Sequence, residues 1–196
     1  MNVKVNHVIV TGLSLMILVF WGNTLWVHAK AKLAQHLIAN AWRASLLDQG
    51  HHKPWAWADT WPIAKLRIPE NNLQFYVLNG SHGSSLAFSP GHISESAYPG
   101  EQGTIIISGH RDTHFYFLKD IQHGDSLELV TPLGQTHRYT VTHVEIRDIR
   151  ETTLEIRYEQ NELKLVTCYP FDAIVPGGPF RMVVTAEKTK KRGSTY

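Results

Sequence analysis

Residues 163–170 read Leu-Lys-Leu-Val-Thr-Cys-Tyr-Pro, an apolar run of strand length that ends at the only cysteine of the chain. Pro170 has no backbone N–H to donate, so it cannot continue the hydrogen bonding of an interior strand. We therefore expect a strand from Leu163 to Cys168, with the thiol of Cys168 at the rim of a sheet.

Six further segments have the character of strands, and turn signals such as Asn79-Gly80 and Gly177-Gly178 separate them. They are residues 63–68, 73–78, 104–108, 126–131, 137–146 and 181–186. Short strands at this spacing indicate a mostly β sandwich or barrel. Residues 115–120 are expected to add one short helical turn.

Two polar residues are expected at the same rim as Cys168. Arg181 opens the strand 181–186, so it stands at the loop end of a hairpin if this strand pairs with 163–168. His110 follows the apolar strand 104–108 in the same way. A thiol beside a base is the minimum apparatus for nucleophilic catalysis, and a cation there suits a bound carbonyl group. Taken singly, each of these residues is more commonly a buried structural residue or a surface group. Their spacing alone leaves both a structural and a catalytic role open.

Length and charge exclude several classes of protein. A chain of 196 residues fits one domain plus an attachment and has no room for two enzymatic domains. All 17 acidic residues but only 12 of the 19 basic residues lie between positions 33 and 187, so this part is acidic and no nucleic-acid partner is expected. One cysteine excludes an internal disulfide and a multi-cysteine metal cluster.

The N-terminal residues 1–32 are expected to form a membrane anchor. Residues 8–27 contain no charged side chain, and a helix of this length spans about 30 Å, the thickness of the hydrocarbon core. Ala29-Lys30-Ala31 also resembles the cleavage site of a signal peptide, but the apolar run exceeds the usual ~7 to 15 residues. Lysines flank both ends of the run, so the positive-inside rule gives no orientation.

The remaining segments divide as follows. Residues 33–47 have apolar positions three and four apart, which predicts a helix that continues out of the membrane. Residues 51–62 are rich in Trp and Pro and form a linker or a strap laid on the domain. We therefore expect a helix and linker over 33–60, a β-domain over 61–187 and a solvated basic tail over 188–196.

Three blocks of this sequence resemble the signature blocks of sortases, the cysteine transpeptidases that attach proteins to cell surfaces. They are Thr104–Phe117 (TIIISGHRDTHFYF), Leu163–Phe171 (LKLVTCYPF) and Phe180–Val184 (FRMVV). The likeness runs from about Trp61 to Ala186, and residues 57–62 are similar to the short, single-anchor sortases of Gram-negative bacteria. One position departs from the family pattern, since Lys164 stands where a threonine is usual.

The resemblance implies a closed β-barrel of about eight strands with short helices, preceded by the transmembrane helix. It also implies that Cys168 is the nucleophile, His110 the general acid and base, and Arg181 the group that steadies the substrate carbonyl and the developing oxyanion. Thr167 is expected to support substrate binding or the oxyanion site. Asp112 either tunes the imidazole of His110 or is an ordinary turn carboxylate.

The substrate implied by the resemblance is a secreted protein with a C-terminal signal similar to Leu-Pro-x-Thr-Gly, cut after Thr and transferred to an amine. Such a substrate requires a single-pass protein of the cytoplasmic (inner) membrane, with the barrel on the extracytoplasmic (periplasmic) side and Met1 inside. An apolar groove must hold Leu and Pro, and its candidates are Val175-Pro176 and residues 144–149.

Other classes of function remain as alternatives. The same residues would serve a membrane-anchored cysteine endopeptidase that hydrolyses the bond, and a non-enzymatic anchored β-domain is the simplest alternative. His110 and His114 stand four residues apart, as in zinc peptidases, but position 111 is Arg where the motif His-Glu-x-x-His needs Glu. No metal and no cofactor are therefore expected.

Overall fold

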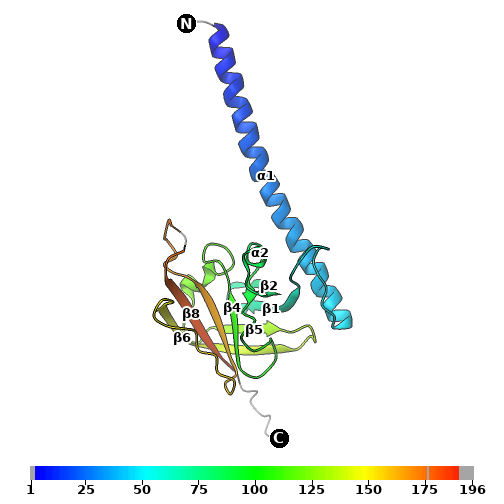
Figure 1. Ribbon diagram of the computed structural model, residues 1–196, viewed down its shortest axis with the longest axis vertical. Helices are drawn as coiled ribbons and strands as arrows, with labels where there is room; N and C mark the ends of the chain where they lie inside the picture. Colours follow the sequence, from blue (N-terminus) through cyan, green and yellow to red (C-terminus); the bar gives the residue numbers. More distant parts are fainter. Residues whose placement is uncertain (1–2, 176, 190–196) are drawn as a thin grey trace. The chain divides into compact units, whose positions relative to one another are not determined.

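The computed structural model describes residues 3–175 and 177–189 and shows a long helix and a β-barrel (Figure 1). Most of the expected basic tail, residues 190–196, lies outside the described residues, as does Pro176. In chain order the elements are α1 (Val3–Asp48), β1 (Pro62–Ile68), η1 (Pro69–Asn71), β2 (Leu73–Asn79), α2 (Gly83–Leu86), β3 (Gly91–His92), β4 (Thr104–Ser108), η2 (Tyr116–Asp120), β5 (Ser126–Val130), β6 (Thr136–Asp148), β7 (Glu162–Cys168) and β8 (Phe180–Lys188).

The chain divides into two compact units, residues 1–37 and 38–196. In the first unit, all side chains from Val10 to Val27 are exposed, among them Phe20 at 67% and Trp21 at 69%. Water does not favour so long an exposed apolar surface. By length and composition, α1 is able to cross a membrane, which is consistent with the expected anchor.

The second unit begins with the last turns of α1, which confirms a helix over residues 33–47. Ile38 and Trp42 are buried at 0% and 2% exposure. The indole of Trp42 lies 6.2 Å from the ring of Tyr76 in β2. The ammonium of Lys65 in β1 lies over both rings, 5.9 Å from the centroid of Trp42 and 4.9 Å from that of Tyr76. These contacts fasten the helix end to the barrel wall through apolar packing and a cation–π interaction.

The segment before β1 is a strap that packs on the barrel unit. The ring of Trp55 meets Phe88 edge-on at 5.4 Å between centroids, and Ala58 is only 3% exposed. The hydroxyl of Thr60 donates to the carbonyl oxygen of Asn79 at 2.7 Å. Of the two expected arrangements for residues 51–62, the structure has the strap.

The strands form a closed barrel in the order β1-β2-β3-β4-β7-β8-β6-β5, in which β1 also pairs with β5 (Figure 1). Because the barrel is closed, the sheet of the described residues has no unpaired edge strand, which in β-proteins is a common way to avoid aggregation. Most neighbours are antiparallel, but β2 pairs with β3 and β4 pairs with β7 in parallel. The expected fold class is therefore confirmed.

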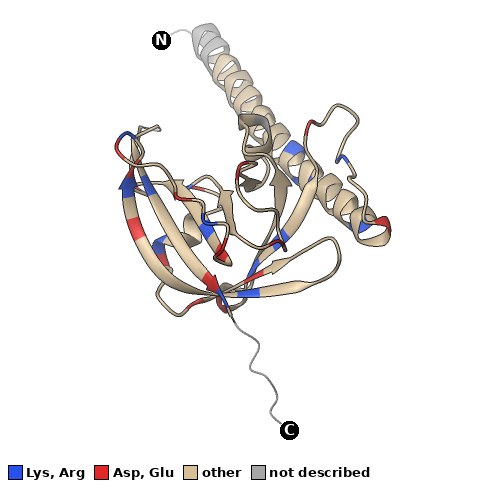
Figure 2. Ribbon diagram, turned by 60° about the horizontal axis from the view of Figure 1, so that its bottom comes forward, with Lys and Arg blue, Asp and Glu red and all other residues tan. Residues whose placement is uncertain are grey.

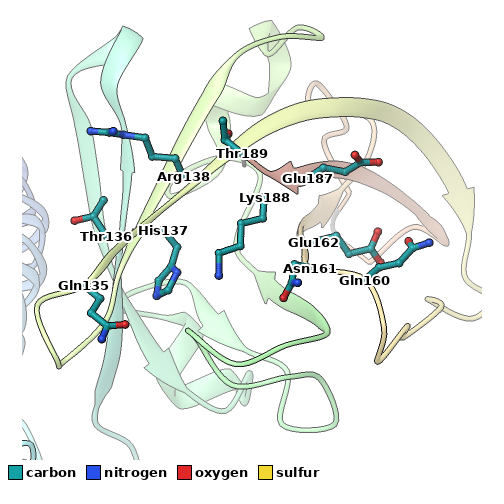
Figure 3. Close-up of a pocket in the computed structure, with 10 residues that line it drawn as sticks. All are labelled: Gln135, Thr136, His137, Arg138, Gln160, Asn161, Glu162, Glu187, Lys188 and Thr189. Atoms are coloured by element: carbon teal, nitrogen blue, oxygen red, sulfur yellow. The ribbon is translucent and has the colours of Figure 1, made fainter. Parts of the chain in front are cut away.

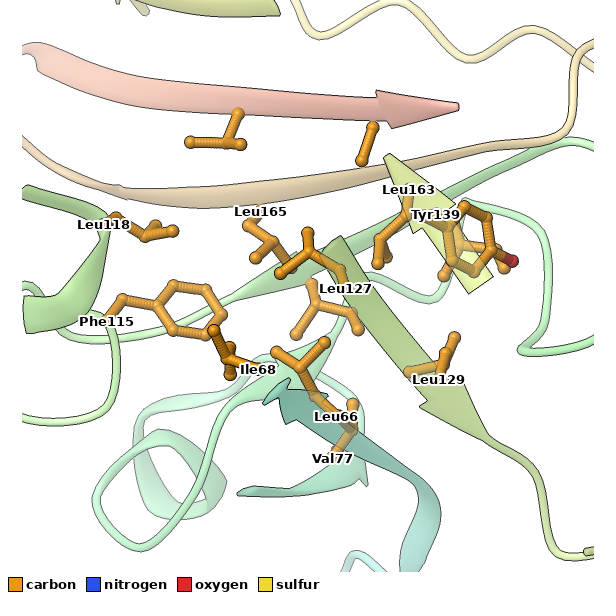
Figure 4. Packing of buried hydrophobic residues seen from close by; sticks show 14 of the residues in the cluster. Leu66, Ile68, Val77, Phe115, Leu118, Leu127, Leu129, Tyr139, Leu163 and Leu165 are labelled. Atoms are coloured by element: carbon orange, nitrogen blue, oxygen red, sulfur yellow. The ribbon is translucent and has the colours of Figure 1, made fainter. Parts of the chain in front are cut away.

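Alternate residues of the strands fill the barrel, as the period of two requires (Figure 4). The interior cluster includes Leu66 of β1, Leu127 of β5, Leu163 and Leu165 of β7 and Val184 of β8, all at 0% exposure. The core is thus assembled from side chains that lie far apart in the sequence, and each strand is held in register by its inward face.

A second, smaller apolar cluster lies on the outer face of the same sheet. Ile106 of β4, Val166 of β7 and Val183 of β8 are buried there, and Leu154 and Ile156 pack against them. The last two residues belong to residues 149–161 between β6 and β7, hereafter the connector. This part of the sheet is covered on both faces, so the residues of β7 from Glu162 to Thr167 are all buried.

All the strands expected from the sequence are present, with ends shifted by at most two residues. The strand β3 and the helix α2 were not expected, because elements of two and four residues are too short to show a period in the sequence. The expected helical turn at 115–120 is the 3-10 helix η2.

Charged residues are interspersed over the strands and loops of the barrel unit (Figure 2). Several of these residues form ion pairs, for example Arg138 with Glu128 at 3.0 Å and Arg150 with Asp148 at 2.6 Å. In both pairs the arginine is exposed to solvent, which limits the contribution of the pair to stability. They are consistent with an ordinary solvated surface.

Three histidines have pKa values below the usual one because the barrel unit buries them. Burial lowers the pKa of His92, of His114 and of His137, and a nearby positive group adds to the effect in the last two cases. His92 is 2% exposed, and its Nε2 bonds to the carbonyl oxygen of Ala97 at 2.9 Å. The native state therefore favours these rings in the neutral form.

We predict that acidification from pH 7.5 to 5.5 lowers the free energy of unfolding. The unfolded chain takes up protons on these rings near pH 6.5, whereas the native chain takes them up only at lower pH, so a fall in pH through this window stabilises the unfolded state. Urea unfolding of the detergent-solubilised chain, followed by tryptophan fluorescence, measures the change.

The variant His92→Gln keeps a side-chain N–H donor for the Ala97 carbonyl but does not titrate in this window. Its urea midpoint is expected to fall less between pH 7.5 and 5.5 than that of the natural chain. His143→Gln, at an exposed position of β6, serves as the control. An unchanged pH dependence in His92→Gln would show that His92 is not part of the effect.

Candidate active site

The structure brings Cys168 and Arg181 directly opposite each other. They are partners in the antiparallel pair β7·β8, at the point where β7 ends and β8 has just begun. Directly opposed residues project from the same face of a sheet, with Cα atoms about 4.5 to 5.5 Å apart. The hairpin that the sequence suggested therefore exists, and its loop end carries the thiol and the guanidinium.

His110 comes to the same end of the sheet through β4. In the parallel pair β4·β7, Ser108 is the partner of Val166, so His110 and Cys168 each follow two residues beyond this pair. The backbone N–H of Gly109 donates to the Val166 carbonyl at 3.1 Å, which continues the pairing past the strand end. The three residues selected from the sequence thus lie at one rim of the barrel.

The side chain of Thr167 ties the two strand ends together. It is 2% exposed, and its hydroxyl donates to the carbonyl oxygen of Gly109 at 2.7 Å. Thr167 belongs to the inward face with Leu165, whereas Cys168 belongs to the outward face with Val166. The Thr167 hydroxyl is therefore a link between the strands that precede Cys168 and His110.

Exposure differs among the three rim residues. Cys168 is partly buried, Arg181 is partly buried, and His110 is exposed. The thiol is therefore neither sealed in the core nor fully open to solvent, as a side chain that reacts with a large substrate requires. The guanidinium and the imidazole are accessible from the same rim.

The guanidinium of Arg181 is held by the loop that joins β7 to β8. Its Nη1 donates to the carbonyl oxygens of Gly178 at 2.6 Å and of Phe180 at 2.9 Å. A guanidinium has five N–H donors, so this anchoring leaves others for a bound group. Arg147 of β6 is the partner of Arg181 on its other side, and the carboxylate of Glu145 neutralises it at 2.8 Å.

A residue that sequence reasoning passed over, Arg111, links two loops of the rim. Its Nη1 donates to the Pro170 carbonyl and its Nη2 to the Ala173 carbonyl, both at 2.7 Å. The residue next to His110 is thus bonded to the loop that follows Cys168. The planar fork of arginine suits such paired contacts, and lysine cannot reproduce both. In the sequence, only its place beside His110, in the Gly-His-Arg-Asp run of residues 109–112, indicates that Arg111 belongs to the site.

The packing beneath His110 requires a glycine before it. A Cβ atom at Gly109 would lie 2.9 Å from ring carbons of Phe115, a side chain with 0% exposure in the barrel interior. The backbone N–H of Phe115 in turn donates to the His110 carbonyl at 2.9 Å. The backbone that carries His110 is therefore placed by the core.

The ring of His110 lies beside the ring of His114. The two rings are roughly parallel, with centroids 6.5 Å apart. Burial lowers the pKa of His114, and the charge of His110 lowers it further, while the carboxylate of Asp112 acts weakly in the opposite direction. Asp112 itself is exposed, and no hydrogen bond joins it to His110 within the described part of the chain.

Two of the apolar residues that the sequence suggested for the groove do not lie on the face of Cys168. Val144 and Ile146 of β6 are partners of Val184 and Met182, so they project from the face opposite to Cys168. The face of Cys168 carries instead the outer cluster that includes Val166 and Val183, with Leu154 and Ile156 of the connector against it. Val175 is 75% exposed in the loop between β7 and β8.

A large hollow of about 1390 Å³ lies at the other end of the barrel (Figure 3). Its lining includes Glu162 at the start of β7 and Lys188 at the end of β8, the ends remote from Cys168 and Arg181. Size alone therefore does not identify the site of chemistry. Within residues 3–175 and 177–189, no three His, Cys, Asp or Glu side chains are grouped to hold a metal ion.

Comparison with known proteins identifies what this arrangement resembles. The model of the sortase domain matches residues 66–189. Sortase D of Bacillus subtilis is 34% identical over 124 residues, which are 63% of this chain and 62% of that protein's length. The segment shared with this relative therefore spans less than two thirds of the relative.

Solved structures show the same fold. A sortase D5 transpeptidase of Clostridium perfringens aligns with a TM-score of 0.65 at 19% identity, over 81% of this chain and 99% of the other. Sortase C1 of Streptococcus agalactiae aligns with a TM-score of 0.58 at 26% identity, over 69% of this chain and 72% of the other.

Proposed function

The chain belongs to the sortase family of cysteine transpeptidases, and from this membership we propose that it cleaves a C-terminal sorting signal and transfers the acyl group to an amine. The observation that carries the proposal is the pairing of Cys168 with Arg181 across β7 and β8, beside the end of β4 that leads to His110. We assign catalysis to the barrel, residues 61–187, and membrane anchoring to residues 1–32, with residues 33–60 as the joining helix and strap.

In the first half-reaction, the thiolate of Cys168 attacks the carbonyl carbon of Thr in a signal similar to Leu-Pro-x-Thr-Gly. The thiolate is the reactive form of cysteine. When the tetrahedral intermediate collapses, the C–N bond breaks and His110 gives its proton to the departing amine. The products are a thioester on Cys168, a neutral His110 and the released C-terminal peptide.

In the second half-reaction, an amine attacks the thioester carbonyl and gives a proton to His110. The C–S bond breaks, which restores the thiolate and the protonated imidazole. Water in place of the amine would give hydrolysis, the reaction of an endopeptidase. Family membership favours transfer, and the two outcomes differ in the mass of the product.

Arg181 is assigned to the negative charge that develops on the carbonyl oxygen in both half-reactions. Its position opposite Cys168 and its anchoring to the carbonyls of Gly178 and Phe180 support this role. A donor that is already in place stabilises the oxyanion without reorganisation during the reaction. Thr167 is assigned a positioning role through its bond to Gly109, and Asp112 a supporting one through the charge around His114.

The remaining assignments concern partners and location. The partners are secreted proteins with the sorting signal, an amine acceptor and the membrane, and no nucleic acid. We propose a single-pass protein of the cytoplasmic membrane with the barrel on the extracytoplasmic side, where a secreted substrate is present. The exposed apolar stretch of α1 supports the anchor.

We predict that the full chain in detergent forms a thioester with a peptide that contains Leu-Pro-x-Thr-Gly. Intact mass spectrometry should show one added acyl group on Cys168, and an added amine should remove it and appear in the peptide product. Cys168→Ala should give no adduct. If the natural chain forms no adduct with any peptide of a panel of this kind, the enzymatic proposal is contradicted. If the released product is the free acid even when amine is present, the reaction is hydrolysis.

We also predict that Arg181→Lys lowers kcat/KM about 10²- to 10³-fold, the typical cost of losing an oxyanion donor. Lysine keeps the charge but lacks the planar fork that bonds to the loop carbonyls and to substrate together. Arg147→Lys, on the neighbouring strand, is the matched control and should stay within a few-fold of the natural chain. Near-normal activity of Arg181→Lys would refute the assigned role.

The orientation predicts the behaviour of reporters fused after Tyr196. Alkaline phosphatase, which needs an oxidising compartment, should be active in cells, and a fluorescent protein that matures only in the cytoplasm should be dark. The reverse pattern would place the barrel in the cytoplasm and exclude secreted proteins as substrates.

A further inference from the structure

We propose that Lys164 is a positioning residue that holds the connector, residues 149–161, against the face of the sheet on which Cys168 lies. The proposal deepens the proposed function and rests on it, because the connector packs on the apolar cluster of the sheet face on which Cys168 lies. Lys164 is also the position at which this chain departs from the family pattern, where threonine is usual.

Lys164 is an unusual lysine because it is almost completely buried. It is 8% exposed and lies on the outward face of β7, four residues before Cys168. Its Nζ donates to the carbonyl oxygen of Glu155 in the connector at 2.8 Å and lies 3.2 Å from Oε1 of Glu162. Burial of an ammonium group is costly unless such partners are present. The bond to the Glu155 carbonyl therefore stabilises the buried ammonium of Lys164 and also attaches the connector to β7.

Glu162 joins this ion pair to a second attachment of the connector. The hydroxyl of Thr104, at 0% exposure in β4, donates to Oε1 of Glu162 at 2.6 Å. The same Thr104 oxygen accepts the backbone N–H of Arg157 at 2.8 Å, and the Thr104 N–H donates to the Arg157 carbonyl at 3.0 Å. The connector is thus bonded to β7 at Glu155 and to β4 at Arg157, through one continuous buried network.

These attachments flank the apolar contacts between the connector and the sheet. Ile156 lies between Glu155 and Arg157, and together with Leu154 it packs on Val166, two residues before Cys168. The connector has no strand or helix from residue 153 to 161 to keep its shape, so its position depends on the buried network and this packing. A wall that loses its fixed position holds the substrate less tightly, which raises KM.

Length explains why lysine and not threonine serves here. The Glu155 carbonyl belongs to a segment that lies above the sheet, and the Lys164 stem of four methylene groups reaches it from the β7 backbone. A threonine hydroxyl stays next to its own backbone and cannot make this bond. Loss of the lysine should therefore free the connector at Glu155 while leaving β7 and its strand pairs intact.

The test is Lys164→Met in the full chain, because methionine fills most of the volume without the charge. Amide hydrogen exchange in peptides that cover residues 154–160 should become about tenfold faster or more, the loss expected for a hydrogen bond to a charged donor. Exchange in β7 and β8 should accelerate less than exchange in the connector, and only as far as the lower global stability requires. With the sorting peptide, KM should rise about three- to tenfold while kcat stays within about twofold, as expected when a substrate-binding wall loosens.

Two further variants separate this role from general damage. Lys164→Met leaves the Glu162 carboxylate buried without its cation, so its thermal midpoint should fall. Adding Glu162→Gln removes that charge and keeps an acceptor for Thr104, so the double variant should regain thermal stability but retain fast exchange in the connector. Lys65→Met, at the half-buried lysine over Tyr76, is the matched control and should leave connector exchange unchanged.

Unchanged exchange over residues 154–160 in Lys164→Met would overturn the proposal. Faster exchange without an effect on KM would also overturn it, since the connector would then be fixed for no catalytic purpose. If the natural chain forms no thioester with any sorting peptide, the proposed function fails, whereas the exchange measurement still reports on the attachment itself. The two failures are therefore distinguishable.

Discussion

The site depends on the hydrogen-bond register of one strand, β7, between two neighbours. Its parallel pairing with β4 fixes where the chain leaves towards His110, and its antiparallel pairing with β8 sets Arg181 opposite Cys168. A slip by one residue in either pair would turn the thiol or its partner to the other face of the sheet. The inward leucines of β7 prevent such a slip, because a shifted register would take them out of the barrel interior and put the charged side chains of Glu162 and Lys164 into it. Core packing and chemistry are thus two consequences of one alignment.

Much of this arrangement could be predicted because strands and rim residues leave local signals. The apolar strands, the hairpin between β7 and β8, and the convergence of Cys168 and Arg181 all follow from alternation and from the proline at 170.

The apolar wall could not be predicted in the same way. A bulge between Val141 and His143 shifts the alternation of β6, so that Val144 and Ile146 continue the inward face and His143, Glu145 and Arg147 take the outward one. Nothing in residues 137–146 reveals on which side of the bulge the pattern resumes.

Contacts between distant backbone and side-chain groups were equally hidden. Arg111 bonds to carbonyl groups about sixty residues away, and Lys164 bonds to a carbonyl in a segment without regular structure. A carbonyl group has no sequence signature, since every residue has one. In the sequence, Lys164 is noticeable only as a departure from the family pattern. In the structure, it is the point where a buried charge makes the connector part of the domain.

The contact between Gly109 and Phe115 restricts how this protein can change over evolution. The only atom that fits on the side of Gly109 facing the ring is a hydrogen, because a Cβ atom would come within 2.9 Å of two ring carbons. Any larger residue at 109 would push the phenylalanine into the packed interior, and any new core residue that tilts the phenylalanine would press on the backbone just before His110. Redesign of the barrel interior for greater heat resistance is therefore not independent of the imidazole, and libraries that vary the core should keep these two positions together.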